Sequence, residues 1–154
     1  MELNQAAGTN DTVRGLTSIT YGGLLVVTNL ASESEAGDSF TLSKTTSYSD
    51  SFAATNMPPL GLGLACSFNP ATGTPRVVST APTNITTLVS GNRLTLSWPP
   101  SHIGWQLQTQ TNAPGTGLGT NWVGLPPSIA TNQMSFTIDP ANGSVFYRMI
   151  FPPR

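Results

Sequence analysis

The chain has 154 residues, of which only 8% are charged, and its formal net charge is −1. This charge balance provides no basic face for phosphates, which argues against a nucleic-acid partner. The longest apolar runs, residues 23–27 and 60–66, are far shorter than the roughly 20 residues of a membrane-spanning helix. The sequence therefore predicts no transmembrane helix.

Uncharged polar residues take the place that charges have on most protein surfaces. A typical soluble domain carries about 25% charged residues, whereas this chain has 38 serines and threonines and 11 asparagines. Threonine suits strands and asparagine suits turns, and neither favours helices. With 15 glycines and 13 prolines, the composition predicts an all-β protein of exported type, built from short strands and many turns.

Strand patterns recur along the first half of the chain. Residues 24–30 form a continuous apolar stretch, which predicts a strand covered on both faces. In segment 39–43, Phe40 and Leu42 alternate with polar residues, which is typical of a half-buried strand. The other strands predicted in this half are residues 12–16, 18–21, 47–53, 62–68 and 76–80.

Alternation is clearer in the second half. Segment 105–111 places three glutamines on one side and a mainly apolar set on the other, which predicts a half-buried strand with a solvated glutamine face. The glutamines are Gln106, Gln108 and Gln110, and the opposite residues are Trp105, Leu107 and Thr109. The other strands predicted here are residues 93–98, 121–125, 133–138 and 145–150, whose spacing suggests a β-sandwich.

The pattern divides the chain into two parts. Residues 1–80 form one predicted β region, residues 81–88 a linker that runs into an edge strand, and residues 89–154 a small antiparallel sandwich. The opening Met-Glu-Leu-Asn-Gln has neither the charged nor the apolar part of a signal peptide. Because the composition is of exported type, we expect a fragment of a longer secreted or cell-surface polypeptide whose upstream part is missing.

The first half resembles the closing rungs of autotransporter-associated β-strand repeat proteins. The resemblance rests on residues 10–27, Asn-Asp-Thr-Val-Arg-Gly-Leu-Thr-Ser-Ile-Thr-Tyr-Gly-Gly-Leu-Leu-Val-Val, and on residues 36–42, Ala-Gly-Asp-Ser-Phe-Thr-Leu. Proteins of that kind are passenger-like parallel β-helices that end in a small β cap. Over about residues 1–80, the resemblance implies the end of a β-solenoid in a secreted or surface scaffold, with no cofactor.

The second half resembles a module at the ends of large exported bacterial proteins, and more loosely a fibronectin type III or immunoglobulin-like sandwich. The matching segments are Arg-Leu-Thr-Leu-Ser-Trp-Pro at 93–99, Gly-Trp-Gln-Leu-Gln-Thr-Gln-Thr-Asn at 104–112, Asn-Trp-Val at 121–123 and Val-Phe-Tyr-Arg at 145–148. The chain departs from that pattern after Tyr147, where little sequence is left for a last strand. This resemblance covers about residues 85–152.

Residues with catalytic potential are few. His102 is the only histidine and Ser101 precedes it, but neighbours in a Pro-Pro-Ser-His loop are not expected to face each other, and no nucleophile elbow is present. One histidine and one cysteine cannot form a His-rich or Cys-based zinc site. Cys66 lies in an apolar setting, so we interpret it as a small hydrophobic residue. The sequence predicts a protein that is not an enzyme and has no cofactor.

Three acidic residues, Glu33, Glu35 and Asp38, leave two alternatives open. Paired carboxylates can hydrolyse glycosides, and carboxylate oxygens can hold Ca²⁺. The segment Ala-Ser-Glu-Ser-Glu-Ala-Gly-Asp has no EF-hand spacing, however, and is typical of a solvated loop. We interpret it as that loop, with calcium binding and hydrolysis as the alternatives.

Tryptophans are the strongest functional signal, because an indole face stacks on a sugar ring. Trp98 and Trp105 fall on the apolar faces of their strands, so we expect them in the core. Trp122 stands beside a loop and is the tryptophan most expected to be exposed. Together with Gln106, Gln108 and Gln110, Trp122 forms the candidate ligand site, with a polysaccharide as one expected partner and another surface protein as the other.

These observations favour one function and leave a second open. The favoured interpretation is a non-catalytic structural and interaction module from the C-terminal end of a secreted or cell-surface bacterial protein. The alternative is a carbohydrate-binding module that serves an upstream enzyme.

Overall fold

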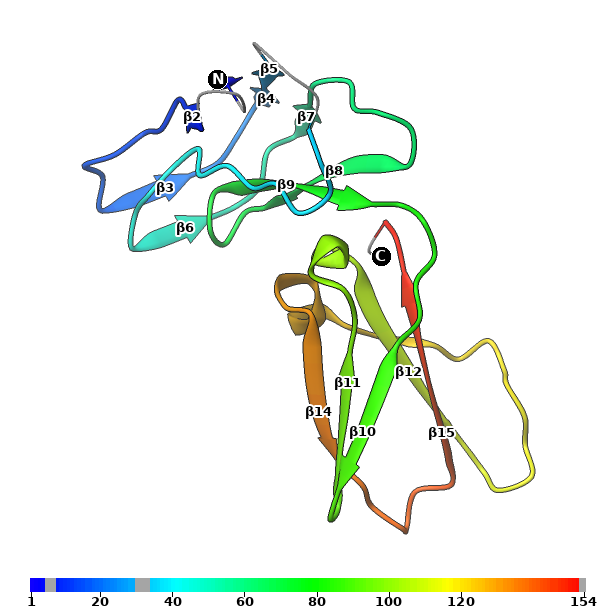
Figure 1. Cartoon of the computed structure of the whole chain (residues 1–154). Helices are drawn as coiled ribbons and strands as arrows, with labels where there is room; N and C mark the ends of the chain where they lie inside the picture. The colour runs from blue at the N-terminus through cyan, green and yellow to red at the C-terminus, as the bar shows by residue number, and fades with distance from the viewer. Residues whose placement is uncertain (5–7, 30–33, 153–154) are drawn as a thin grey trace. The chain divides into compact units, whose positions relative to one another are not determined.

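A computed structural model describes residues 1–4, 8–29 and 34–152 (Figure 1). Within these residues the only helices are two 3-10 turns of 3 and 5 residues, so the all-β prediction is confirmed. None of the described helices is long and apolar enough to span a membrane. The chain divides into two compact units, Met1–Ala81 and Pro82–Arg154.

The strands of the first unit are mostly two or three residues long. They are β1 (Glu2–Asn4), β2 (Thr9–Asn10), β3 (Ser18–Thr20), β4 (Leu24–Val26), β5 (Thr28–Asn29), β6 (Ser47–Ser49), β7 (Ala54–Asn56), β8 (Leu64–Asn69) and β9 (Thr74–Ser79).

Parallel pairs at a nearly constant sequence interval organise this unit. β3 pairs with β6 and β4 pairs with β7, both in parallel, and an isolated parallel bridge precedes them. The paired residues are Val13 with Ser43, Ser18 with Ser47 and Leu24 with Ala54. Partners are therefore 29 or 30 positions apart, so that residues 13–26 run beside residues 43–56 in the same direction.

The remaining strands of this unit form one mixed sheet and one antiparallel hairpin. β1 lies between β2, which is antiparallel to it, and β5, which is parallel to it. β8 and β9 form a hairpin, and β9 also pairs with the segment around residues 38–42, where Phe40 N donates to Pro75 O at 3.0 Å. The predicted strand 39–43 is thus reduced to isolated bridges at Ser39 and Ser43.

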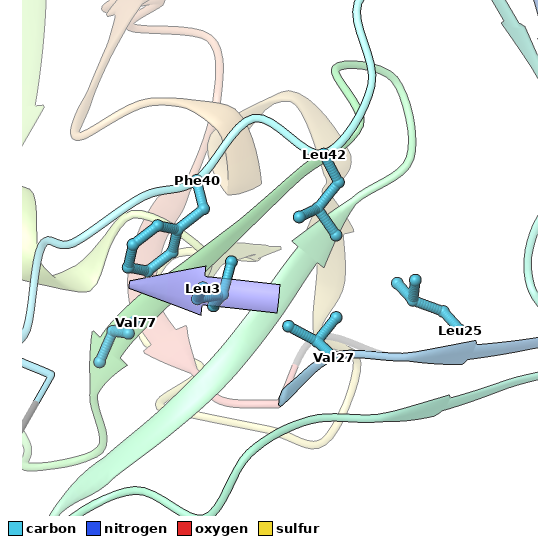
Figure 2. Close-up of a cluster of buried hydrophobic side chains, with 6 residues drawn as sticks. All are labelled: Leu3, Leu25, Val27, Phe40, Leu42 and Val77. Carbon is cyan, nitrogen blue, oxygen red and sulfur yellow. The ribbon is translucent and has the colours of Figure 1, made fainter. Parts of the chain in front are cut away.

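The core of the first unit collects apolar side chains from β1, from β4 and the residue after it, from the segment around residues 38–42 and from β9 (Figure 2). Its buried members are Leu3, Leu25, Val27, Phe40, Leu42 and Val77. Burying side chains of this size contributes about 1.5–3 kcal/mol each relative to leaving them in water. The short strands are therefore held by shared burial rather than by the length of their ladders.

Segment 24–30 differs from its prediction. Leu25 and Val27 are buried, but Leu24 is 61% exposed and Val26 43% exposed, and Leu30 lies outside the described residues. The expectation of a strand covered on both faces is therefore wrong. Only one face of this segment packs against the core. A continuous apolar run does not show which of its residues will face outward.

The second unit consists of two three-stranded antiparallel sheets with the orders β10-β11-β14 and β13-β12-β15. Its elements are β10 (Thr86–Ser90), β11 (Arg93–Ser97), η1 (Pro100–His102), β12 (Gln106–Asn112), β13 (Val123–Leu125), η2 (Pro126–Ala130), β14 (Gln133–Thr137) and β15 (Ser144–Ile150). Residues 86–88 of the expected linker belong to β10, and the strands predicted at 93–98, 105–111, 121–125, 133–138 and 145–150 are present with ends shifted by one or two residues.

One apolar core lies between these two sheets. Leu96 and Trp98 from the first sheet pack with Leu107 from the second, and all three are almost completely buried. The expectation that Trp98 and Trp105 are buried is confirmed, at 3% and 8% exposure. Trp105, however, lies against His102 and Phe151 at the end of the unit, with ring centroids 5.2 and 5.7 Å away.

Candidate functional site

The row of glutamines on β12 is buried, so the predicted solvated glutamine face is wrong. Gln106 is 3% exposed, Gln108 8% and Gln110 1%. The chain that follows β12 returns alongside it as β13 and covers Gln106 and Gln110, whereas Gln108 accepts a hydrogen bond from Arg148 on β15. Period-two alternation correctly separates the two faces of the strand, but it does not show that the polar face will be covered.

Gln110 illustrates how this cover is built. Its Oε1 accepts a hydrogen bond from Gly119 N at 2.8 Å, and its Nε2 donates to Gly119 O at 3.1 Å. Asn112 Nδ2 also donates to Gln110 Oε1, at 2.9 Å. The side chain thus ties the loop after β12 to the strand.

Replacing Gln110 with leucine is expected to lower the free energy of unfolding of the second unit by about 1–3 kcal/mol, because Gly119 N–H then loses its acceptor. The measurement is denaturant unfolding followed by tryptophan fluorescence, since all three tryptophans lie in this unit. Gln133→Leu is the matched control, because Gln133 is exposed and surface changes usually cost within about 0.5 kcal/mol. Equal losses in both variants would contradict a structural role for Gln110.

Gln106 has a different neighbour. Its amide lies over Gly124 on β13, where an added Cβ would stand 2.8 Å from Gln106 Nε2. The absence of a side chain at Gly124 therefore makes room for the glutamine.

Two residues of the predicted site, Trp122 and Gln108, contact Arg148, an exposed residue of β15. Arg148 Nε donates to Gln108 Oε1 at 2.8 Å, and its guanidinium carbon lies 4.2 Å from the centre of the Trp122 ring. Trp122 is half-buried rather than fully exposed. A guanidinium stacked on an indole face is held in one orientation, and this cation–π contact contributes about 0.5–1 kcal/mol at an exposed position.

A hollow of about 480 Å³ adjoins this cluster. Trp105, Gln108, Arg148, Ile150, Phe151 and Pro152 contribute to its lining. Its volume lies within the range of small-molecule sites, whereas its lining is more polar than apolar.

Gln108 lines this hollow, and Trp122 lies against the guanidinium of Arg148. Gln106 and Gln110 do not line it and contact Gly124 and Gly119 instead. Arg148 and Phe151 were missed by the sequence prediction. Arg148 stands directly opposite Gln108 in the β12–β15 ladder, and this pairing leaves no signal in the sequence of either strand.

His102 and Ser101 do meet, contrary to expectation. Ser101 Oγ lies 3.0 Å from His102 Nδ1, because the 3-10 turn η1 brings neighbouring side chains together. Asp139 is the one acidic residue of the second unit. It follows β14 at the Arg93 end of the β11–β14 ladder, whereas His102 follows β11 at the Ser97 end. A Ser-His-Asp triad is therefore not assembled from these residues.

The acidic segment shows local loop contacts. Asp38 Oδ2 accepts a hydrogen bond from Glu35 N at 2.8 Å, while Glu33 lies outside the described residues. Within residues 1–4, 8–29 and 34–152, no group of three or more His, Cys, Asp or Glu side chains is gathered for a metal ion.

The thiol of Cys66 is half-buried on β8. Burial raises its pKa to about 11, which keeps the group protonated and weakly nucleophilic at neutral pH.

A second candidate surface lies in the first unit. An apolar hollow of about 250 Å³ opens beside β3 and β4 and is lined by residues that include Val13, Leu16, Ile19, Tyr21 and Leu25. Val13 and Leu16 are 45% and 47% exposed. Large apolar side chains grouped in this way mark an interaction surface more often than a solvated one.

Comparison with models of known protein families, with curated proteins and with solved structures finds no match for this chain.

Proposed function

We propose that this chain is a non-catalytic structural and interaction module from the C-terminal end of a secreted or cell-surface bacterial protein. The observation that carries the proposal is the spacing of 29 or 30 residues between the parallel partners of segments 13–26 and 43–56; the parallel pair of β1 and β5 is 26 positions apart. Stacking of successive passes at a constant interval is the construction principle of solenoids. The first unit is accordingly a β-solenoid end of the autotransporter-associated repeat type, and the second a fibronectin type III-like sandwich.

The interaction surface in this proposal is the apolar hollow beside β3 and β4. Its occupant is a further parallel rung, supplied by the longer polypeptide to which the module belongs. Two features support this choice. The hollow is lined by the same kind of side chains that are buried between the described passes, and β1 already adds a parallel strand to β5 nearby. The low content of charge and the wealth of hydroxyl groups support an extracellular location.

Duplicating one pass of the solenoid tests this proposal. A second copy of residues 13–42, inserted between Leu42 and Ser43, keeps the parallel partners of segments 13–26 and 43–56 at 29 or 30 positions. We expect the enlarged chain to unfold cooperatively, because repeats contact mainly their neighbours and tolerate insertion in register. The measurement is thermal unfolding followed by circular dichroism, with a midpoint at or above that of the parent chain.

The control is an insertion out of register, a duplicate of residues 13–34 at the same place. This copy shifts the partners by eight positions and is expected to abolish cooperative unfolding of the first unit. Equal behaviour of the two insertions, or loss of folding in both, would remove the solenoid interpretation.

The second candidate function is carbohydrate binding. It is favoured by the cluster of Trp122, Gln108 and Arg148 beside the hollow with Trp105 and Phe151. Aromatic faces with neighbouring amide and guanidinium donors match the C–H faces and hydroxyl oxygens of a sugar. This function is independent of the first unit and compatible with an upstream enzyme in the same polypeptide.

A further inference from the structure

Two side chains that line the 480 Å³ hollow, Gln108 and Arg148, carry hydrogen-bond donors. Gln108 Oε1 accepts a hydrogen bond from Arg148 Nε. The Gln108 amide NH₂ and the two terminal NH₂ groups of Arg148 remain as donors without a partner among the described residues. A guanidinium has no acceptor atom. A ligand of this hollow must therefore bring acceptors, and a carboxylate is a group that matches the planar fork of an arginine.

Among the described residues, no acidic side chain compensates the charge of Arg148. Residues 82–154 contain three arginines and a single acidic side chain, Asp139. Asp139 lies in the turn after β14, where its Oδ1 accepts from Ala141 N at 2.9 Å, and no described residue forms an ion pair with Arg148. An anionic ligand would supply the missing counter-charge.

Arg148 is held in place before any ligand arrives. Gln108 is 8% exposed and fixes Nε, while the Trp122 ring supports the guanidinium plane at 4.2 Å. Fixing a long side chain in advance reduces the entropy that binding would otherwise cost. The buried glutamine and the indole ring thus restrain the guanidinium from two directions, and we call this arrangement of Gln108, Trp122 and Arg148 the clamp.

A small apolar wall lines part of the same hollow, whose surface is polar for the larger part. The rings of Trp105 and Phe151 lie 5.7 Å apart at 31°, and Ile150 extends the wall along β15. A sugar ring offers a C–H face to such a wall and hydroxyl oxygens to the amide of Gln108. A simple inorganic anion would use only the guanidinium.

We propose that this hollow binds the carboxylate-bearing sugar of an acidic polysaccharide, with Arg148 pairing the carboxylate and Gln108 a hydroxyl. The inference rests on the carbohydrate-binding function proposed above and names its substrate class. It does not depend on the solenoid interpretation of the first unit.

Calorimetric titration of the full chain tests this site. The probes are a soluble oligomer of galacturonic acid and its neutral counterpart, an oligomer of galactose. We expect the acidic oligomer to bind and Arg148→Gln to weaken it by about tenfold or more, the size of a charge-assisted hydrogen bond. Arg93→Gln is the matched control, because Arg93 is an exposed arginine on β11 of the same unit and its loss changes the net charge equally.

The outcomes separate the two claims. Binding of the acidic oligomer that falls in Arg148→Gln and persists in Arg93→Gln supports the clamp. Equal binding of both oligomers, unchanged in Arg148→Gln, would overturn the acidic-sugar inference while leaving carbohydrate binding in place. No binding of either oligomer by a folded parent chain would contradict both, and equal weakening by both arginine variants would reduce the effect to overall charge.

Discussion

Leu107→Ala is expected to lower the free energy of unfolding of the second unit by about 2–5 kcal/mol. Leu107 has no exposed surface and lies at the centre of the core that the two sheets share. In the ladders of β12 it stands opposite Leu125 on one side and Met149 on the other. Truncation would leave a cavity among strands whose hydrogen bonds limit how far they can close around it.

The measurement is chemical denaturation followed by tryptophan fluorescence, because Trp98, Trp105 and Trp122 all lie in this unit. Leu118→Ala provides the matched control: Leu118 is 68% exposed, and its truncation should cost within about 0.5 kcal/mol. A loss below about 1 kcal/mol for Leu107→Ala would mean that the two sheets do not share a packed core.

Gly73→Ala is expected to destabilise the first unit by about 2–4 kcal/mol, from two additive causes. Gly73 has φ +64°, a left-handed conformation that costs an alanine about 1–2 kcal/mol. An added Cβ would also overlap Ser43 Oγ and stand 3.2 Å from the Tyr21 hydroxyl oxygen. Tyr21 and Ser43 are themselves buried, so neither can move away freely.

Gly23→Ala separates the two causes. Gly23 has almost the same φ, +65°, but an added Cβ meets nothing within 4 Å, so only the conformational cost of about 1–2 kcal/mol remains. The measurement is amide hydrogen exchange at Leu42, whose N–H donates to Gly73 O at 3.0 Å. Equal protection of Leu42 in both variants would show that the turn at Gly73 is not packed against Ser43.

Much of the second unit follows from local pattern. Alternation in segments 93–98 and 133–138 places Leu96, Met134 and Phe136 toward one core, and the structure buries or half-buries all three. Such segments are predictable because each strand carries its own apolar face, which needs only an opposite sheet to cover it. The strands β1, β2 and β7 were missed for the opposite reason. They are two or three residues long, and they exist through their partners rather than through a pattern of their own.

The candidate site shows the same division at the level of single residues. Sequence alternation correctly grouped Gln106, Gln108 and Gln110 on one face of β12, but it could not show that Gly119 and Gly124 would cover two of them. Trp122 was correctly selected as the tryptophan outside the core. Its partner Arg148 comes from β15, the neighbouring strand on the other side of β12, and only strand order brings the two together.

The sequence by itself determined the class of this protein: an all-β chain with little charge, few reactive groups and no long helix, because composition and two-residue alternation act locally. The tertiary structure alone decided which polar face is covered, which side of the 24–30 segment meets the core, and that partners 29 or 30 residues apart run in parallel. Those properties depend on contacts between residues distant in sequence, and such contacts leave no periodic signal within a single strand.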